Sequence, residues 1–69
     1  MNDNVKLQKR IGKQVKKARE KKGWSIPELA HAVDVSSDII VHIENGTQPF
    51  NIDTCLRIAF ALETELVYP

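Results

Sequence analysis

The sequence contains one cysteine, Cys55, and lacks any run of about 18 consecutive apolar residues. A single thiol cannot form an internal disulfide or a Cys-x-x-Cys site, so a cystine or zinc framework is excluded. Without a long apolar run no segment is expected to span a membrane, and the polar, lysine-rich N-terminus has no secretory signal. We therefore expect a cytoplasmic protein.

The chain also has almost no net charge, because ten Lys and Arg are balanced by nine Asp and Glu. The balance conceals an asymmetry. Residues 1–22 contain nine basic and two acidic residues, a net charge of +7, whereas residues 23–69 contain one basic and seven acidic residues, a net charge of −6. This asymmetry suggests that one end of the chain meets nucleic acid or another anionic partner.

Catalytic patterns are missing as well. The sequence has no glycine-rich phosphate loop, no paired carboxylates in a plausible cleft and no nucleophile with a nearby base. His31, His42 and Cys55 fit no metal-ligand spacing. We expect neither an enzyme nor a cofactor, and we interpret Cys55 and Trp24 as core residues and His31 as a surface residue.

What is present is enough for one small domain of 69 residues, of which 42% are hydrophobic. A domain of this size buries only about 60% of its unfolded surface. Since no disulfide or metal can add stability, we expect self-association to do so. Residues 1–4 read as a disordered start, and residues 5–69 as the single domain.

Helical periodicity and capping residues predict four helices. The first runs from Val5 to Gly23, and the second, over residues 26–33, begins with a Ser25–Glu28 capping box. The third runs from the Ser36 cap to Glu44, and the fourth, capped by Asn51, covers residues 52–62. Their expected inward positions are Leu7, Ile11, Val15, Ala18, Leu29, Ala30, Val33, Ile40, Ile43, Ile52, Leu56, Ala59 and Leu62. The tail, residues 64–69, could be a strand or another helical turn.

The second and third helices are short and joined by about three residues, which is helix-turn-helix spacing. From Ile11 to Leu66 the sequence resembles the helix-turn-helix domain of the lambdoid repressor and Cro type, also called the xenobiotic-response-element type. The positions that carry the resemblance are Arg19, Gly23, Ser25, Glu28-Leu29-Ala30, Val35-Ser36, Ile40, Ile43-Glu44-Asn45-Gly46, Ile58-Ala59 and Ala61-Leu62.

The resemblance implies a compact all-α bundle of four to five helices whose third helix reads DNA bases, usually as a dimer on a two-fold operator. The implied base-reading residues are Ser36, Ser37, Asp38, Ile39 and His42. The expected phosphate contacts are Lys9, Arg10, Lys13, Ser25, Asn45, Thr47 and Gln48, with free amides at the start of the second helix. The basic first helix could also be only a solvated face, and His42 only an exposed residue.

One further feature follows from the resemblance, and another from the apolar residues near the C-terminus. The resemblance implies a partly buried ion pair between Arg19 and Glu44 that locks the first helix to the third. The C-terminal apolar residues Phe60, Leu66, Val67 and Tyr68 either cap the core or form a dimer interface.

The sequence departs from the family pattern at the expected DNA-facing surface. Ile26 stands where the family often has Gln, and the third helix carries Asp38, Ile39 and Val41 with no Lys or Arg. Asp38 could accept a hydrogen bond from cytosine, and Ile39 could contact a thymine methyl. We therefore expect weak affinity per subunit.

We interpret the chain as a bacterial or phage DNA-binding transcriptional regulator, a repressor or controller that works as a homodimer, with no sensor or catalytic module attached. The alternative is a protein-interaction module of the same fold, such as an antitoxin that neutralises a toxin, or a coactivator-like adaptor. A toxin or polymerase is then a possible protein partner.

Overall fold

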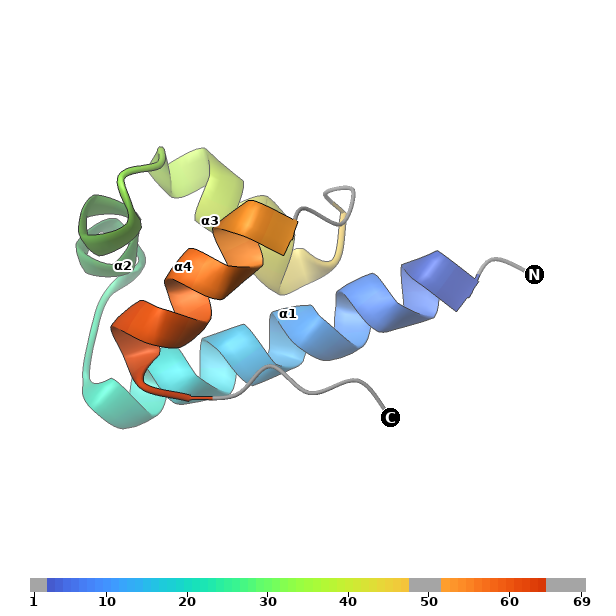
Figure 1. The fold of residues 1–69 in the computed structure, drawn as a ribbon, viewed down its shortest axis with the longest axis horizontal. Coiled ribbons are helices and arrows are strands. Elements are labelled where there is room, and N and C mark those ends of the chain that lie inside the picture. Colours follow the sequence, from blue (N-terminus) through green and yellow to red (C-terminus); the bar gives the residue numbers. More distant parts are fainter. Residues whose placement is uncertain (1–2, 48–51, 65–69) are drawn as a thin grey trace.

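A computed structural model describes residues 3–47 and 52–64 of the chain. The helices are α1 (Asp3–Lys22), α2 (Ile26–Val33), α3 (Ser37–Asn45) and α4 (Ile52–Leu62). The long first helix, α1, runs along one side of the molecule; α3 and α4 pack against it, and α2 packs against α3 and α4 (Figure 1). The described residues contain no strand, so the all-α prediction is confirmed.

Helix α1 begins two residues earlier than the sequence suggested. Asp3 and Asn4 are helical, so the expectation of a disordered start at residues 1–4 is wrong for these two, and residues 1–2 lie outside the described part. Extending an existing helix by one residue requires no new nucleus, which favours this longer start. The expected apolar stripe is confirmed, with Ile11 and Val15 buried and Leu7 and Ala18 packed beside them.

Both short helices begin and end as their sequences predict. The Ser25 hydroxyl accepts the amide of Glu28 at 3.2 Å, while the Ser25 amide donates to the Glu28 carboxylate at 2.7 Å. The Ser36 hydroxyl caps α3 by accepting the Ile39 amide at 3.3 Å. Gly46 ends α3 with a φ of 73°, a left-handed conformation in which glycine is favoured.

All four helices contribute to one hydrophobic core, against which Trp24 and Cys55 are partly buried. Within the described residues, no helix has the length and hydropathy of a membrane span. The buried apolar residues are Ile11, Val15, Leu29, Ala30, Val33, Ile40, Ile58 and Leu62.

The predicted register of α4 is wrong. Leu62 is buried as expected, but Ile52 is 53% and Leu56 65% exposed, while Thr54 and Ile58 are buried instead. Apolar residues occur on several faces of this helix, so periodicity alone does not select one. The inward face of α4 also includes the polar residue Thr54, which a search for apolar residues does not select. The Asn51 cap and the 65–69 tail lie outside the described residues.

Gly12 brings α1 and α3 closer than any other residue would permit. A Cβ atom added there would lie 2.6 Å from the carbonyl oxygen of Glu44 and still closer to that of Ile43. Both obstacles are backbone atoms of α3, so they cannot move aside as a flexible side chain would. The helix contact therefore depends on this glycine, which sequence reasoning missed although a glycine inside a helical pattern is a known signal of close packing.

We predict that Gly12→Ala lowers the free energy of unfolding by about 1–3 kcal/mol, because the added methyl overpacks the α1–α3 contact. At an exposed helix position the same change would be stabilising. Urea unfolding compares this variant with the exposed α1 control Lys17→Ala, which we expect to resemble the parent. A Gly12→Ala protein as stable as the parent would contradict the close contact.

Candidate nucleic-acid interface

Helices α2 and α3 form a two-helix unit joined by residues 34–36. Asp34 ends α2 in the left-handed conformation with a φ of 59°, and the Val35 amide donates to the carbonyl of Ala30 at 3.0 Å. Val35 packs against the core, and Ser36 then begins α3. The turn therefore fixes the direction in which α3 leaves α2, which is the geometry of a helix-turn-helix.

Helix α3 has distinct inner and outer faces. Ile40 is fully buried and Ile43 packs against the core, whereas Asp38 and His42 are exposed. Ser36 is exposed too, with its hydroxyl engaged as the helix cap, and Ser37 and Ile39 are partly exposed. The residues predicted to read bases thus share an accessible surface that runs along the outer side of α3 from Ser36 to His42.

The start of α2 is less suited to phosphate than the resemblance implied. The amides of Ser25 and Glu28 are both hydrogen bonded within the capping box, so the expectation of free amides is wrong for these two. Hydrogen bonding to Ser25 lowers the pKa of Glu28, and the backbone of Ser25 contributes more to this effect than its side chain does. A carboxylate that stays ionised at this position repels phosphate, and a Ser25–phosphate contact would have to displace it.

The other predicted phosphate contacts lie at the C-terminal end of α3 and on α1. Asn45 and Thr47 are exposed, and the stem of Lys9 crosses the face of Gly46, since a Cβ there would lie 2.6 Å from the Lys9 Cγ. Arg10 and Lys13 are exposed on α1, and Gln48 lies outside the described residues. The structure therefore brings Lys9 next to the end of α3.

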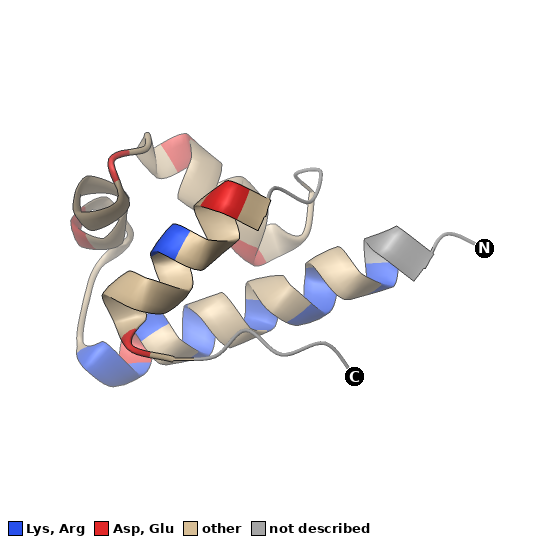
Figure 2. Cartoon of the chain, in the orientation of Figure 1, with Lys and Arg blue, Asp and Glu red and all other residues tan. Residues whose placement is uncertain are grey.

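Positive charge is concentrated away from α3. Figure 2 shows Lys and Arg along α1. Helix α4 contains Arg57, and neither α2 nor α3 contains Lys or Arg. Arg57 is paired with Asp53 at 3.0 Å. Long-range attraction to an anionic partner must therefore come from α1.

The ion pair implied between α1 and α3 is present. Arg19 donates to both carboxylate oxygens of Glu44, at 2.7 Å from Nε and 3.1 Å from Nη2, and to the Trp24 carbonyl at 2.9 Å from Nη1. The two side chains are only 11% and 5% exposed. The hydrogen bond to Glu44 raises the pKa of Arg19 despite the opposing effect of burial.

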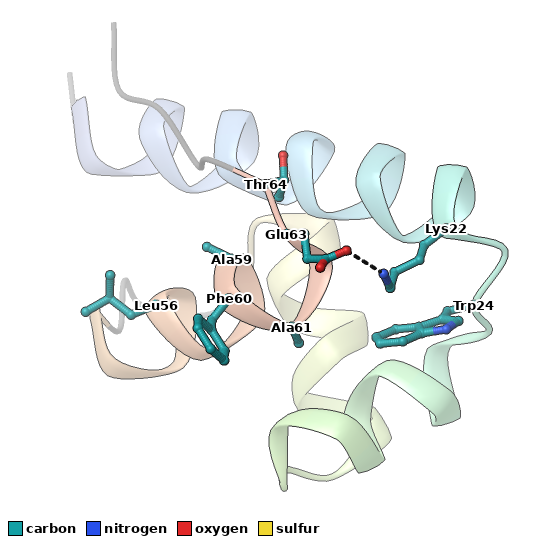
Figure 3. Close-up of a pocket in the computed structure, with 8 residues that line it drawn as sticks. All are labelled: Lys22, Trp24, Leu56, Ala59, Phe60, Ala61, Glu63 and Thr64. Carbon is teal, nitrogen blue, oxygen red and sulfur yellow. Dashed lines mark hydrogen bonds and ion pairs between the residues drawn. The ribbon is translucent and has the colours of Figure 1, made fainter.

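The outer face of α4 is unusually apolar. Phe60 is 88% exposed and lies in line with the exposed Leu56 and Ile52, one and two turns earlier. Figure 3 shows Leu56 and Phe60 on one side of an open groove, with Trp24 and the Lys22–Glu63 ion pair on the other. Phe60 was predicted as an apolar surface residue, but Leu56 was predicted inward; Leu66, Val67 and Tyr68 lie outside the described residues.

Comparisons with known proteins match this geometry. The helix-turn-helix family model covers residues 15–68. A Pyrococcus abyssi (strain GE5 / Orsay) protein, named as an HTH-type transcriptional regulatory protein, is 34% identical over 58 residues. The clp gene regulator ClgR from Corynebacterium glutamicum has a TM-score of 0.82 and 25% identity over 87% of this chain. The match to the Pyrococcus protein spans 84% of this chain but only 18% of that protein. The match to ClgR spans 64% of the ClgR chain.

We predict that Arg19→Met and Glu44→Leu each lower the free energy of unfolding by about 3 kcal/mol, because each leaves a nearly buried charge without its partner. The double variant should recover most of that loss, since it buries no unpaired charge. Urea unfolding of the four proteins gives the coupling energy. Strictly additive losses would show that the pair does not act as a unit.

Proposed function

Because this chain belongs to the Cro/C1-type helix-turn-helix family of transcriptional regulators, we propose that it binds a two-fold DNA operator as a homodimer and acts as a repressor or controller. A cytoplasmic location, where such DNA is accessible, is part of the proposal. The observation that carries it is the outer face of α3. This face presents the partly exposed Ser37 and the exposed Asp38 and His42 outward, while Ile40 anchors the opposite face in the core.

The charge distribution assigns different tasks to different helices. Exposed cations on α1, among them Lys9 beside the end of α3, attract the phosphate backbone without reading sequence. The α3 surface has no Lys or Arg and contributes hydrogen bonds and apolar contacts to base edges. The resulting affinity of one subunit is modest, so occupancy of an operator depends on two linked subunits.

The α4 stripe of Ile52, Leu56 and Phe60 supplies a surface for the second copy. Exposed apolar residues in line on one helix are typical of an interface, and a domain this small gains stability by covering them. The correction at Leu56 supports this proposal, because a residue predicted inward adds its area to the outer face. Leu66, Val67 and Tyr68 remain part of the proposed interface.

A two-fold axis near Leu56 makes the stripe self-complementary. If two α4 helices pack antiparallel about that axis, Leu56 meets its own copy and Ile52 meets Phe60 of the second copy. Asp53 and Arg57 lie one turn apart beside the stripe and already form an ion pair at 3.0 Å. Under the same axis Asp53 lies opposite Ala59 and Arg57 opposite Cys55 of the second copy, so no like charges lie directly opposite.

The second candidate function is a protein-interaction module of the same fold, such as an antitoxin or an adaptor for polymerase. The observation that favours it is the mixture of apolar and acidic side chains on the outer surface of α3. Val41 is 37% exposed there, close to Asp38 and the partly exposed Ile39. Such a surface suits a protein partner as well as it suits base edges.

We predict that a random-duplex selection enriches one operator, which the protein prefers to random DNA by about 10³-fold or more. Fluorescence anisotropy should give a steep negative salt slope, because α1 cations displace counterions from phosphate. Ser37→Ala and His42→Ala should relax selection at single base pairs while the helical circular dichroism signal is retained. Absence of any sequence preference would contradict the regulator and favour the protein-interaction module.

We predict that Leu56→Glu and Phe60→Glu each convert the dimer into a monomer in sedimentation velocity, because each places a charge in the centre or the end of the stripe. Val41→Glu, which alters an exposed apolar residue on a different helix, should leave the dimer intact. A parent chain that sediments as a monomer at all concentrations would rule out the homodimer. Dimeric Leu56→Glu and Phe60→Glu variants would place the interface elsewhere.

A further inference from the structure

We infer that Thr47 positions His42 so that the histidine presents a hydrogen-bond acceptor to DNA and selects the amino group of a base. The inference rests on the proposed DNA binding. The Thr47 hydroxyl oxygen lies 3.0 Å from His42 Nδ1, and it also donates to the His42 carbonyl at 3.3 Å. Both residues are exposed, at the outer surface where α3 ends.

The direction of these two hydrogen bonds determines the histidine tautomer. A threonine hydroxyl has a single hydrogen, and we assign it to the backbone carbonyl of His42, whose oxygen lies 3.3 Å from the Thr47 hydroxyl oxygen. The oxygen is then left to accept from Nδ1, so Nδ1 carries the proton of the neutral imidazole. The other ring nitrogen, Nε2, consequently offers a lone pair and acts as an acceptor.

A backbone hydrogen bond holds Thr47 next to His42. The Thr47 amide donates to the same His42 carbonyl at 3.0 Å, as part of the turn that Gly46 makes at the end of α3. Two contacts from one residue therefore converge on His42. The resemblance assigned Thr47 to phosphate, but its only hydroxyl hydrogen has an intramolecular acceptor, which makes it a positioning residue for His42.

Asp38 gives the same face a second acceptor. It lies four residues before His42, so the two side chains occupy the same side of α3 about one turn apart, and both are exposed. Acceptors in the major groove pair with exposed amino groups, which are the N4 group of cytosine and the N6 group of adenine. Guanine presents only N7 and O6 acceptors there and is disfavoured.

Cytosine is favoured over adenine at both positions. In an A·T pair the adenine amino group lies between two acceptors, its own N7 and the thymine O4, whose lone pairs repel a further acceptor, whereas in a C·G pair the cytosine amino group has an acceptor, the guanine O6, on one side only. Charged groups on the elements that bound this surface include Asp38 on α3 and Lys9 on α1, whose stem packs against Gly46. The reading face of one subunit thus selects two amino-bearing bases, cytosine foremost.

The tautomer is tested on the full chain without DNA. Long-range ¹H–¹⁵N NMR at a pH where the imidazole is neutral should show His42 with a protonated Nδ1 and an unprotonated Nε2. Thr47→Val removes the hydroxyl with little change in volume and should shift the proton to Nε2, whereas Thr47→Ser should retain the parent pattern. A parent protein with Nε2 protonated would overturn the inference and leave the proposed DNA binding untouched.

Base selection is tested with a random-duplex library. The parent and Thr47→Ser should enrich cytosine at the His42 position, whereas Thr47→Val should lose that preference by about tenfold and keep selection at the Asp38 position. If Thr47→Val instead weakened binding to all sequences equally, Thr47 would be a phosphate contact and the inference would be wrong. A parent protein that enriched no sequence would refute the proposed function itself, and the inference with it.

Discussion

The contact between α1 and α3 determines the direction of the outer surface of α3, the surface that we propose reads DNA. Helix α3 buries only one side chain completely, Ile40, so apolar packing alone holds it weakly. The Arg19–Glu44 ion pair and the close backbone approach at Gly12 supply what packing does not. The ion pair is directional and defines the orientation of α3 relative to α1. The close approach at Gly12 is steric and defines the distance between the two helices. These two contacts therefore also determine the position of the outer surface of α3.

This arrangement connects electrostatic attraction to sequence reading. Helix α1 carries the exposed cations and also contributes Arg19 to the ion pair with Glu44. The ion pair therefore fixes the position of the charged surface of α1 relative to the outer surface of α3. In the proposed function the outer surface of α3 contacts DNA, and α3 contains no Lys or Arg. A rigid α1–α3 contact therefore substitutes for charge on the recognition helix, because it keeps Lys9 beside the end of α3.

Local signals in the sequence predicted the parts of the fold that local interactions determine. The Ser25–Glu28 box, the Ser36 cap and the Gly46 turn involve residues three or four apart, and each forms as predicted. The resemblance added the Arg19–Glu44 pair, which spans 25 residues. The register of α4 and the requirement for Gly12 depend instead on which surface meets a distant helix. Nothing within α4 distinguishes Ile58 from Leu56 as the buried residue, so the register of α4 could be determined only from the three-dimensional structure.

The acidic groups near the DNA-facing surface have a consistent physical meaning. Asp38 projects from α3, and Glu28 occupies the helix start where a phosphate would otherwise bind. Both repel the phosphate backbone and thus weaken binding to every sequence alike. Only a base whose amino group pairs with Asp38 offsets that repulsion, so the penalty falls most heavily on non-cognate DNA. Specificity is a difference of affinities, and a repulsive group can raise it as effectively as an attractive one. The near-zero net charge of the chain is therefore compatible with selective DNA binding, provided that two subunits act together.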